Sequence, residues 1–256
     1  MYFTLSPKNV AIASIFTKQA FANTNHINAM INNHFQNNNV NNGYWKTNQA
    51  FHNQLNNDIN NLQNYGCYCY LDGTHHPAKG KYQDIFDEVC RNLVRGYDCI
   101  EFDDLNEREE AESNDPSLDL DDDACIPWLV DYTPPEEGDY WGYDKCEELN
   151  PNDICKQRTC IVETRFAGHL LDLFYDEKTL NESLFHENDF YPEDTCAVKP
   201  GRADVVKDCC GNYPYRLPYR HKNNDRMCCG NSVYNPVIDS CCESNSGFVD
   251  FEICPN

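Results

Sequence analysis

The sequence predicts a mainly α, disulfide-rich protein that ends in a small cysteine-rich module of short strands and turns. Sixteen cysteines occur in 256 residues, which is too many for a reducing compartment unless they bind metal or carry out redox chemistry. Before residue 200, apolar residues recur with the spacing of amphipathic helices. After Pro200, glycine, proline, tyrosine, asparagine and Cys-Cys doublets replace that spacing, which favours short strands held by disulfides rather than by a core.

The beginning of the chain has the features of a secretory signal. Met1 to Asn9 carries one lysine, Val10 to Phe16 is apolar, and Ala20 to Ala22 offers the small residues that signal peptidase prefers. We therefore expect a signal peptide over 1–22, with an ordinary buried helix as the alternative. No other apolar stretch approaches the roughly 18 residues that a membrane-spanning helix needs. The mature protein is thus expected to be secreted, extracellular and without a transmembrane segment.

The cysteine spacing favours disulfides over metal ligands, although a metal site remains an alternative. The closest non-adjacent pair, Cys67 and Cys69, lacks the CxxC spacing of zinc modules. Adjacent half-cystines rarely bond to each other, so each doublet is expected to connect two distant segments. The connectivity stays open. All sixteen cysteines are predicted to form disulfides: Cys67, Cys69, Cys90, Cys99, Cys125, Cys146, Cys155, Cys160, Cys196, Cys209, Cys210, Cys228, Cys229, Cys241, Cys242 and Cys254.

Helical periodicity occurs at four places in a predicted helical domain over 23–195. Two amphipathic helices are expected near 27–35 and 51–62, although seventeen asparagines between Asn23 and Asn64 make them dependent on tertiary packing. A third is expected over 84–93, and the longest over 155–174. Asn181 begins the chain's N-glycosylation sequon. The cysteine-rich module is predicted over 196–256.

A net charge of −22 argues against nucleic acid as a partner and favours cations or basic surfaces. The charge is concentrated in an insertion over 101–123, where twelve of twenty-three residues are acidic and Arg108 is the one basic residue. We expect a flexible, solvated loop, because such a block repels itself and has few apolar residues. The alternative is weak, multi-site binding of calcium, with Asp121, Asp122 and Asp123 among the ligands.

A motif in the helical domain resembles the calcium loop and first long helix of secreted phospholipase A2. It consists of Tyr65-Gly66-Cys67-Tyr68-Cys69, then Asp72-Gly73 and Pro77, then the segment Asp84 to Cys90. The resemblance covers roughly 26–176 and implies a loop that wraps one Ca²⁺. It places a degenerate calcium site at Tyr68, Tyr70, Asp72 and Asp98, with Tyr70 and Asp72 standing where the family has glycines.

The catalytic residues that the resemblance would imply are missing. The family motif CCxxHDxC is replaced by the segment Cys90 to Cys99, which contains no histidine, and Ile161 follows Cys160 where the family places an orienting aspartate. Without an imidazole, the helix has no general base near pH 7. His75, His76 and His169 are interpreted as exposed or packing residues. No catalytic residue is therefore assigned.

The tail has a resemblance of its own. Three doublets, at Cys209-Cys210, Cys228-Cys229 and Cys241-Cys242, form a degenerate repeat, in which the first two are followed by a glycine and a tyrosine. This repeat is similar to the di-cysteine repeats of galaxin-like proteins of coral and mollusc skeletons. A generic disulfide knot is the alternative.

Together these features predict a secreted, non-catalytic matrix protein of biomineral or shell type. Such a protein would bind calcium or calcium carbonate weakly, at many sites, and assemble with other matrix proteins. Acidic phospholipase-like domains without catalytic residues also occur in the otoconins, which this combination resembles. The main alternative is a calcium-dependent secreted phospholipase A2 or a lipid-binding derivative. A venom, egg-coat or mucus component with the same modules also stays open.

Overall fold

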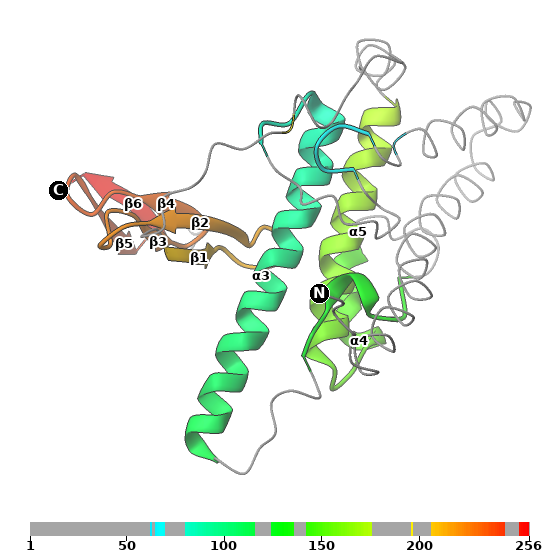
Figure 1. The fold of residues 1–256 in the computed structure, drawn as a ribbon, viewed down its shortest axis with the longest axis horizontal. Coiled ribbons are helices and arrows are strands. Elements are labelled where there is room, and N and C mark those ends of the chain that lie inside the picture. Colours follow the sequence, from blue (N-terminus) through cyan, green and yellow to red (C-terminus); the bar gives the residue numbers. More distant parts are fainter. Residues whose placement is uncertain are drawn as a thin grey trace, which may run out of the picture.

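The computed structural model describes residues 62, 65–69, 80–115, 124–135, 142–175, 196, 206–243 and 251–255. The predicted signal peptide, nearly all of the two asparagine-rich helices, and Asn181 lie outside these residues. Within them, helices and short antiparallel strands occur together, so the fold is disulfide-rich and mixed rather than clearly mainly α (Figure 1).

The longest element is α3 (Ile85–Asn114), a helix of 30 residues. The side chain of Asp84 caps its beginning by accepting a hydrogen bond from the backbone N–H of Asp87 at 3.1 Å. Its buried side chains include Phe86, Val89, Leu93 and Ile100, which are three, four and seven residues apart and therefore share one face. The helix predicted for 84–93 is present, but it continues for about two thirds of its length beyond that range.

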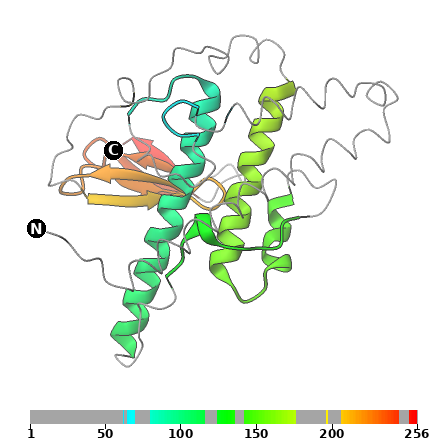
Figure 2. The same ribbon diagram turned by 45° about the vertical axis from the view of Figure 1, so that its right-hand side comes forward.

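The expectation of a flexible loop is wrong for the first part of the acidic insertion, because 101–114 belong to α3. The glutamates, leucine, arginine and alanine of this segment are good helix formers, and like-charge repulsion does not outweigh that preference. An ion pair between Arg108 and Asp104, with a nitrogen to oxygen distance of 2.9 Å, supports the helix at i and i+4. Both views in Figures 1 and 2 show the end of α3 projecting beyond the neighbouring elements.

The second long helix, α5 (Ile154–Tyr175), confirms the helix predicted for 155–174. It runs antiparallel to α3 (Figure 1) and shares a core with it. The rings of Phe86 and Phe174 lie 5.4 Å apart between centroids. Gly96 allows the helices to approach, since a Cβ at this position would lie 2.6 Å from a methyl group of Val162. The helix pair is the framework on which the other elements rest.

Shorter elements connect and cover the helix pair. They are two 3₁₀ turns, η1 (Pro127–Leu129) and η2 (Gly142–Lys145), and one turn of helix, α4 (Cys146–Leu149). Cys146 and Tyr132 are buried against Cys160 and Ile161 of α5 in a second, smaller core.

The tail consists of three antiparallel hairpins, which confirms the expected short strands. They pair β1 (Val206–Cys210) with β2 (Leu217–His221), β3 (Met227–Cys229) with β4 (Ser232–Tyr234), and β5 (Asp239–Glu243) with β6 (Phe251–Pro255). Each is a two-stranded sheet of its own. Such hairpins are marginal in isolation, so they depend on the disulfides for their arrangement.

All sixteen cysteines form eight disulfides, as predicted, and the structure supplies the connectivity. Five involve the helical part: Cys67–Cys196, Cys69–Cys90, Cys99–Cys209, Cys125–Cys155 and Cys146–Cys160. Three lie within the tail: Cys210–Cys228, Cys229–Cys241 and Cys242–Cys254. In each doublet the first cysteine bonds backwards along the chain and the second bonds forwards. We use the name cystine ladder for the four disulfides that the doublets form: Cys99–Cys209, Cys210–Cys228, Cys229–Cys241 and Cys242–Cys254.

Candidate functional site

The segment 65–69 lies against the beginning of α3, held there by a buried aspartate. One carboxylate oxygen of Asp87 accepts hydrogen bonds from the backbone N–H groups of Cys67 (3.0 Å) and Gln83 (2.9 Å). The other accepts from the N–H of Tyr68 at 2.8 Å. Asp87 is fully buried. Its carboxylate therefore occupies the inside of the turn, and the N–H groups of the segment point at it.

Gly66 makes this turn possible. Its φ is +60°, a backbone conformation that residues with a Cβ rarely adopt. A Cβ here would also overlap the carboxyl group of Asp87. Burial raises the pKa of Asp87, while the three backbone N–H groups oppose that rise. The disulfide Cys69–Cys90 fixes the other end of the turn to α3. The sequence analysis missed Asp87, although its spacing of three residues from the capping Asp84 marks both as residues of a helix start.

The residues predicted for a calcium site are not brought together where they are described. The hydroxyl of Tyr68 donates to the carbonyl of Gly80 at 2.7 Å. Asp98 lies eleven residues beyond Asp87 on α3, about 16 Å along the axis at 1.5 Å per residue, and pairs with Lys207 of β1 at 3.0 Å. Tyr70 and Asp72 lie outside the described residues. Tyr68 therefore lies against the beginning of α3, at Asp87, whereas Asp98 lies near the middle of that helix.

On α3, an aliphatic residue stands at the position where the resemblance would place a catalytic histidine. Counting from Cys90, that position is Leu93, which is buried in the main core. His75 and His76 lie outside the described residues. His169 comes from α5, beside Val89 and Leu93 of α3.

The end of α3 presents carboxylates to solvent on a regular helix. Glu109, Glu110 and Glu112 are exposed and have no ion pair within the part of the chain that the structure describes. Glu107 is paired with Arg158 of α5, which donates two hydrogen bonds to it at 2.5 and 3.1 Å. Asp121, Asp122 and Asp123 follow this helix in sequence but lie outside the described residues. We call Glu109, Glu110 and Glu112 the acidic tip.

Glu101 begins the acidic segment in a different environment. Burial raises its pKa to about 7, and the neighbouring charge of Asp98 adds to the rise, while Lys207 opposes it. This carboxyl group is therefore partly protonated near neutral pH, in contrast to the exposed acidic tip.

One group of three possible metal ligands occurs among the described residues, at the far end of the tail. The ligand atoms of Cys242, Glu252 and Cys254 all lie within 4.8 Å of one another. Both cysteines are joined in a disulfide, so neither offers a thiolate. The group therefore gives no indication of a calcium site.

The first hairpin of the tail is fixed to the helix pair by a partly buried clamp around Asp103, which the sequence did not indicate. Arg216 donates to both carboxylate oxygens of Asp103, from Nε at 2.6 Å and from a terminal nitrogen at 2.7 Å. The hydroxyl of Tyr213 donates to the same carboxylate at 2.9 Å. Arg95 donates to the carbonyl of Pro218 at 2.7 Å. Together with the disulfide from Cys99, these contacts make β1 and β2 one body with α3.

A second buried carboxylate organises the side of α5 that faces η1. Glu163 is fully buried and accepts from the hydroxyls of Tyr97 (2.5 Å) and Tyr132 (2.6 Å). Burial and the charge of Glu163 raise the pKa of Tyr132. These bonds connect α3, α5 and the segment before η2, so the carboxylate has a structural role.

Comparison with known proteins gives no relative for this chain. No family model, no curated protein and no solved structure matches it. Within the described residues, no helix combines the length and the apolar character needed to cross a membrane.

Proposed function

We propose that this chain is a secreted, non-catalytic, acidic protein of an extracellular or biomineral matrix, which binds calcium ions or calcium carbonate weakly and at several sites. The observation that carries the proposal is the acidic tip. Its three exposed carboxylates stand on a continuous helix without cationic partners in the described part of the chain. Carboxylate oxygens are the ligands that Ca²⁺ prefers.

The geometry supports several weak sites rather than one tight site. A tight calcium site surrounds the ion with six to eight oxygens at 2.3–2.6 Å. Side chains on one helix lie on a convex surface, and within the acidic tip Glu109 and Glu112, at i and i+3, share a face and can meet at one ion, whereas Glu110 points elsewhere. Water or a mineral surface would supply the remaining ligands. The expected Kd is on the order of 10⁻⁴ to 10⁻³ M, as in extracellular modules.

The cystine ladder supports the extracellular part of the proposal. Disulfides form and persist mainly in oxidising environments such as the extracellular space, and the described residues hold eight of them. The ladder also connects three hairpins, an arrangement in keeping with the di-cysteine repeats that the tail resembles. Assembly with other matrix proteins is proposed on that likeness.

Calorimetric titration of the oxidised full chain with Ca²⁺ tests the proposal. Changing Glu109, Glu110 and Glu112 together to glutamine should lower the number of bound ions by about one or more, because it removes the carboxylates of the acidic tip. The matched control changes Glu147, Glu148 and Glu243, which are exposed elsewhere, and removes the same charge. Equal losses in the two variants would mean that only net charge matters and would contradict a site on α3.

A calcium-dependent phospholipase A2, or a lipid-binding derivative, is the second candidate. The observation in its favour is the turn over 65–69, which is tied to the beginning of a helix that runs antiparallel to α5. That order of loop and helices is what the resemblance implies. Release of fatty acid from phospholipid vesicles, measured with Ca²⁺ and with chelator, decides between the two. Calcium-dependent hydrolysis would favour the enzyme and would require one of the histidines as its base.

A further inference from the structure

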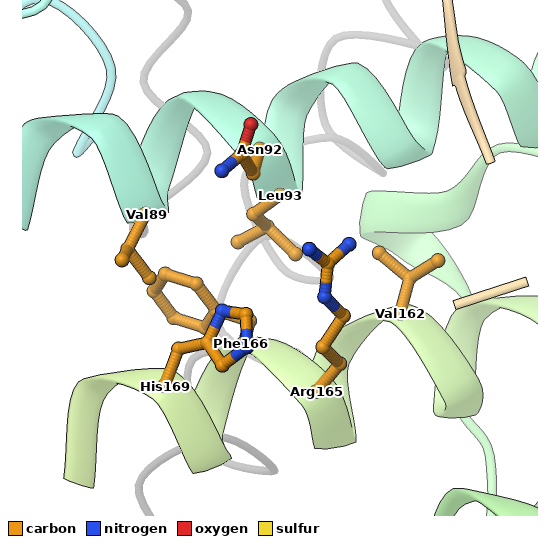
Figure 3. A pocket seen from close by; sticks show the side chains of 7 residues that line it. All are labelled: Val89, Asn92, Leu93, Val162, Arg165, Phe166 and His169. Atoms are coloured by element: carbon orange, nitrogen blue, oxygen red, sulfur yellow. The ribbon is translucent and has the colours of Figure 1, made fainter. Parts of the chain in front are cut away.

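The hollow between α3 and α5 is too small to hold a ligand. Figure 3 shows it between side chains of the two helices, among them Leu93, Phe166 and His169. Its volume is about 10 Å³, which is the space of one water molecule at most. The helix pair therefore offers no binding cavity there, whereas the outer surface of the tail carries exposed apolar side chains.

Large apolar side chains are exposed where the last two hairpins of the tail meet. Met227 of β3 is 42% exposed, and Phe251 and Ile253 of β6 are 50% and 37% exposed. The disulfide Cys229–Cys241 joins these two hairpins, and β6 contacts both β3 and β4. We call Met227, Phe251 and Ile253 the apolar row.

The strand register places the apolar row on the faces that this disulfide connects. Met227 lies two residues before Cys229, and side chains two residues apart point to the same side of a strand. Ile253 lies directly across from Cys241, and Phe251 is two residues before Ile253. The apolar row therefore flanks the disulfide on one side of the joined hairpins, and its side chains remain exposed there.

A charged residue stands at each end of the apolar row, and the two charges are opposite. Arg226 precedes Met227, and Glu243 lies directly across from Phe251. The two ends are separated, because Phe251 lies close to Gly230, about 10 Å along β3 from Met227 at 3.3 Å per residue. Arg226 and Glu243 are exposed, and neither forms an ion pair within the described residues.

The charge of the molecule indicates which partner fits this surface. The chain has a net charge of −22, but the described part of the tail carries as many lysines and arginines as aspartates and glutamates. Both ribbon views place the tail on the opposite side of α3 from α5 and away from the acidic end of α3 (Figures 1 and 2). Two copies of this chain repel each other through their acidic parts, whereas the neutral tail lets them approach.

We propose that the apolar row is a self-association surface, through which two copies of this chain form a two-fold symmetric dimer. A two-fold axis perpendicular to the row aligns the rows of the two copies in opposite directions. The Arg226 end of each row then meets the Glu243 end of the other, so ion pairs flank a shared apolar centre. Contiguous exposed apolar side chains are typical of such surfaces. This proposal rests neither on calcium binding nor on the matrix function.

Sedimentation equilibrium of the oxidised full chain, with a calcium chelator present, tests the proposal. The mass should rise from monomer to dimer between about 1 µM and about 1 mM protein, with a Kd on the order of 10⁻⁵ M, because so small a surface gives a weak interface. Growth beyond the dimer would contradict the two-fold contact. A chain that stays monomeric throughout would overturn the proposal, and if it then binds phosphatidylcholine vesicles, the occupant of the row is a lipid surface.

Removing one apolar side chain tests whether the row carries the contact. Phe251→Ser should weaken dimerisation by at least about tenfold. Leu105→Ser is the matched control, since Leu105 is 46% exposed and lies on α3, outside the tail. Its dimer Kd should stay within about twofold of that of the unaltered protein. Equal Kd values for the two variants would contradict the assigned surface.

Exchanging the charges at the two ends tests the two-fold geometry. Arg226→Glu and Glu243→Arg should each dimerise at least about tenfold more weakly alone, because like charges then meet at both ends of the row. An equal mixture of the two variants should form a heterodimer with a Kd within about threefold of that of the unaltered protein, because every facing pair again has opposite charges. Near-UV circular dichroism checks that each variant is folded. If the folded variants fail to associate when mixed, the two-fold geometry is wrong.

Discussion

A single carboxylate, that of Asp87, determines how the turn over 65–69 meets α3. It is fully buried and accepts hydrogen bonds from three backbone N–H groups, two in the turn and one just before α3. A buried N–H that loses its acceptor costs more than the hydrogen bond itself contributes. The backbone N–H groups of Cys67 and Tyr68 therefore point toward a protein carboxylate, which fixes the orientation of this turn on α3.

Asp87→Asn tests this role directly. The amide keeps one acceptor oxygen but turns an NH₂ group toward N–H donors, so at least one donor is left unsatisfied. We expect the free energy of unfolding to fall by about 2 to 4 kcal/mol, measured by urea unfolding with the disulfides intact. The control Glu88→Gln makes the same charge change at the next, less buried residue. Its free energy of unfolding should stay within about 0.5 kcal/mol of that of the unaltered protein. If the two variants lose the same free energy of unfolding, the hydrogen bonds from Cys67, Tyr68 and Gln83 to Asp87 do not stabilise the fold.

Glu101 makes stability depend on pH in a predictable direction. Its pKa in the folded protein is about 7, against 4.5 for the free side chain, so the folded state holds more protons between these values. Stability should therefore fall as pH rises through this window, and the loss is complete above about pH 7. Glu101→Gln should stabilise the protein by about 1 to 2 kcal/mol at pH 8, after allowance for solvent screening.

The same variant should make little difference at pH 4, where Glu101 is mostly protonated in both states. Thermal unfolding of the two proteins across pH 4 to 8 provides the measurement. A stability difference independent of pH would show that the glutamine acts through packing and not through the charge of residue 101.

The helices show where sequence patterns succeed and where they fail. The apolar spacing predicts α5 over nearly its full length, because most of its buried side chains are apolar, although Thr159, Glu163 and Thr164 are buried among them. The acidic half of α3 is helical although its charge density predicts a loop, because its helix propensity outweighs the repulsion between its carboxylates. Two features favour the helix: Ile100 continues the buried face, and Asp103 is buried in place of an apolar residue because Arg216 neutralises it. That arginine is 113 residues away, so no local pattern could reveal it.

Arg216→Lys tests the clamp between α3 and the first hairpin. Lysine keeps the charge but cannot make the two-pronged contact with Asp103. We expect faster amide hydrogen exchange in β1 and β2 and a loss of about 1 to 3 kcal/mol in stability. Arg220→Lys, at an exposed position of β2, is the matched control. If amide hydrogens of β1 and β2 exchange at the same rate in both variants, the disulfide Cys99–Cys209 and not the clamp holds the hairpin on α3.

At the scale of the whole molecule, the cysteine content predicts a disulfide-rich fold, and the structure confirms it. Sequence reasoning predicted that all sixteen cysteines would be bonded and that each doublet would connect two different segments, and both expectations are confirmed. It could not give the connectivity, because pairing depends on which residues the fold brings within bonding distance. The bond Cys67–Cys196, for example, spans 129 residues.

Charge is distributed unevenly between the two parts of the molecule. In the described residues of the tail, five lysines and arginines accompany five aspartates and glutamates, so this part is neutral. The negative charge therefore resides in the rest of the chain, and the end of α3 carries an exposed part of it (Figures 1 and 2).

Hydrogen exchange with mass spectrometry, with and without a few millimolar Ca²⁺, tests the central claim most directly. If the acidic tip binds calcium, ions that relieve repulsion among Glu109, Glu110 and Glu112 should slow exchange over 104–115 and leave 65–69 unchanged. Magnesium at the same concentration, which gives up its water less readily, should protect this segment less. Protection confined to 65–69 and the beginning of α3 would contradict the account and would favour a single calcium loop of the phospholipase type.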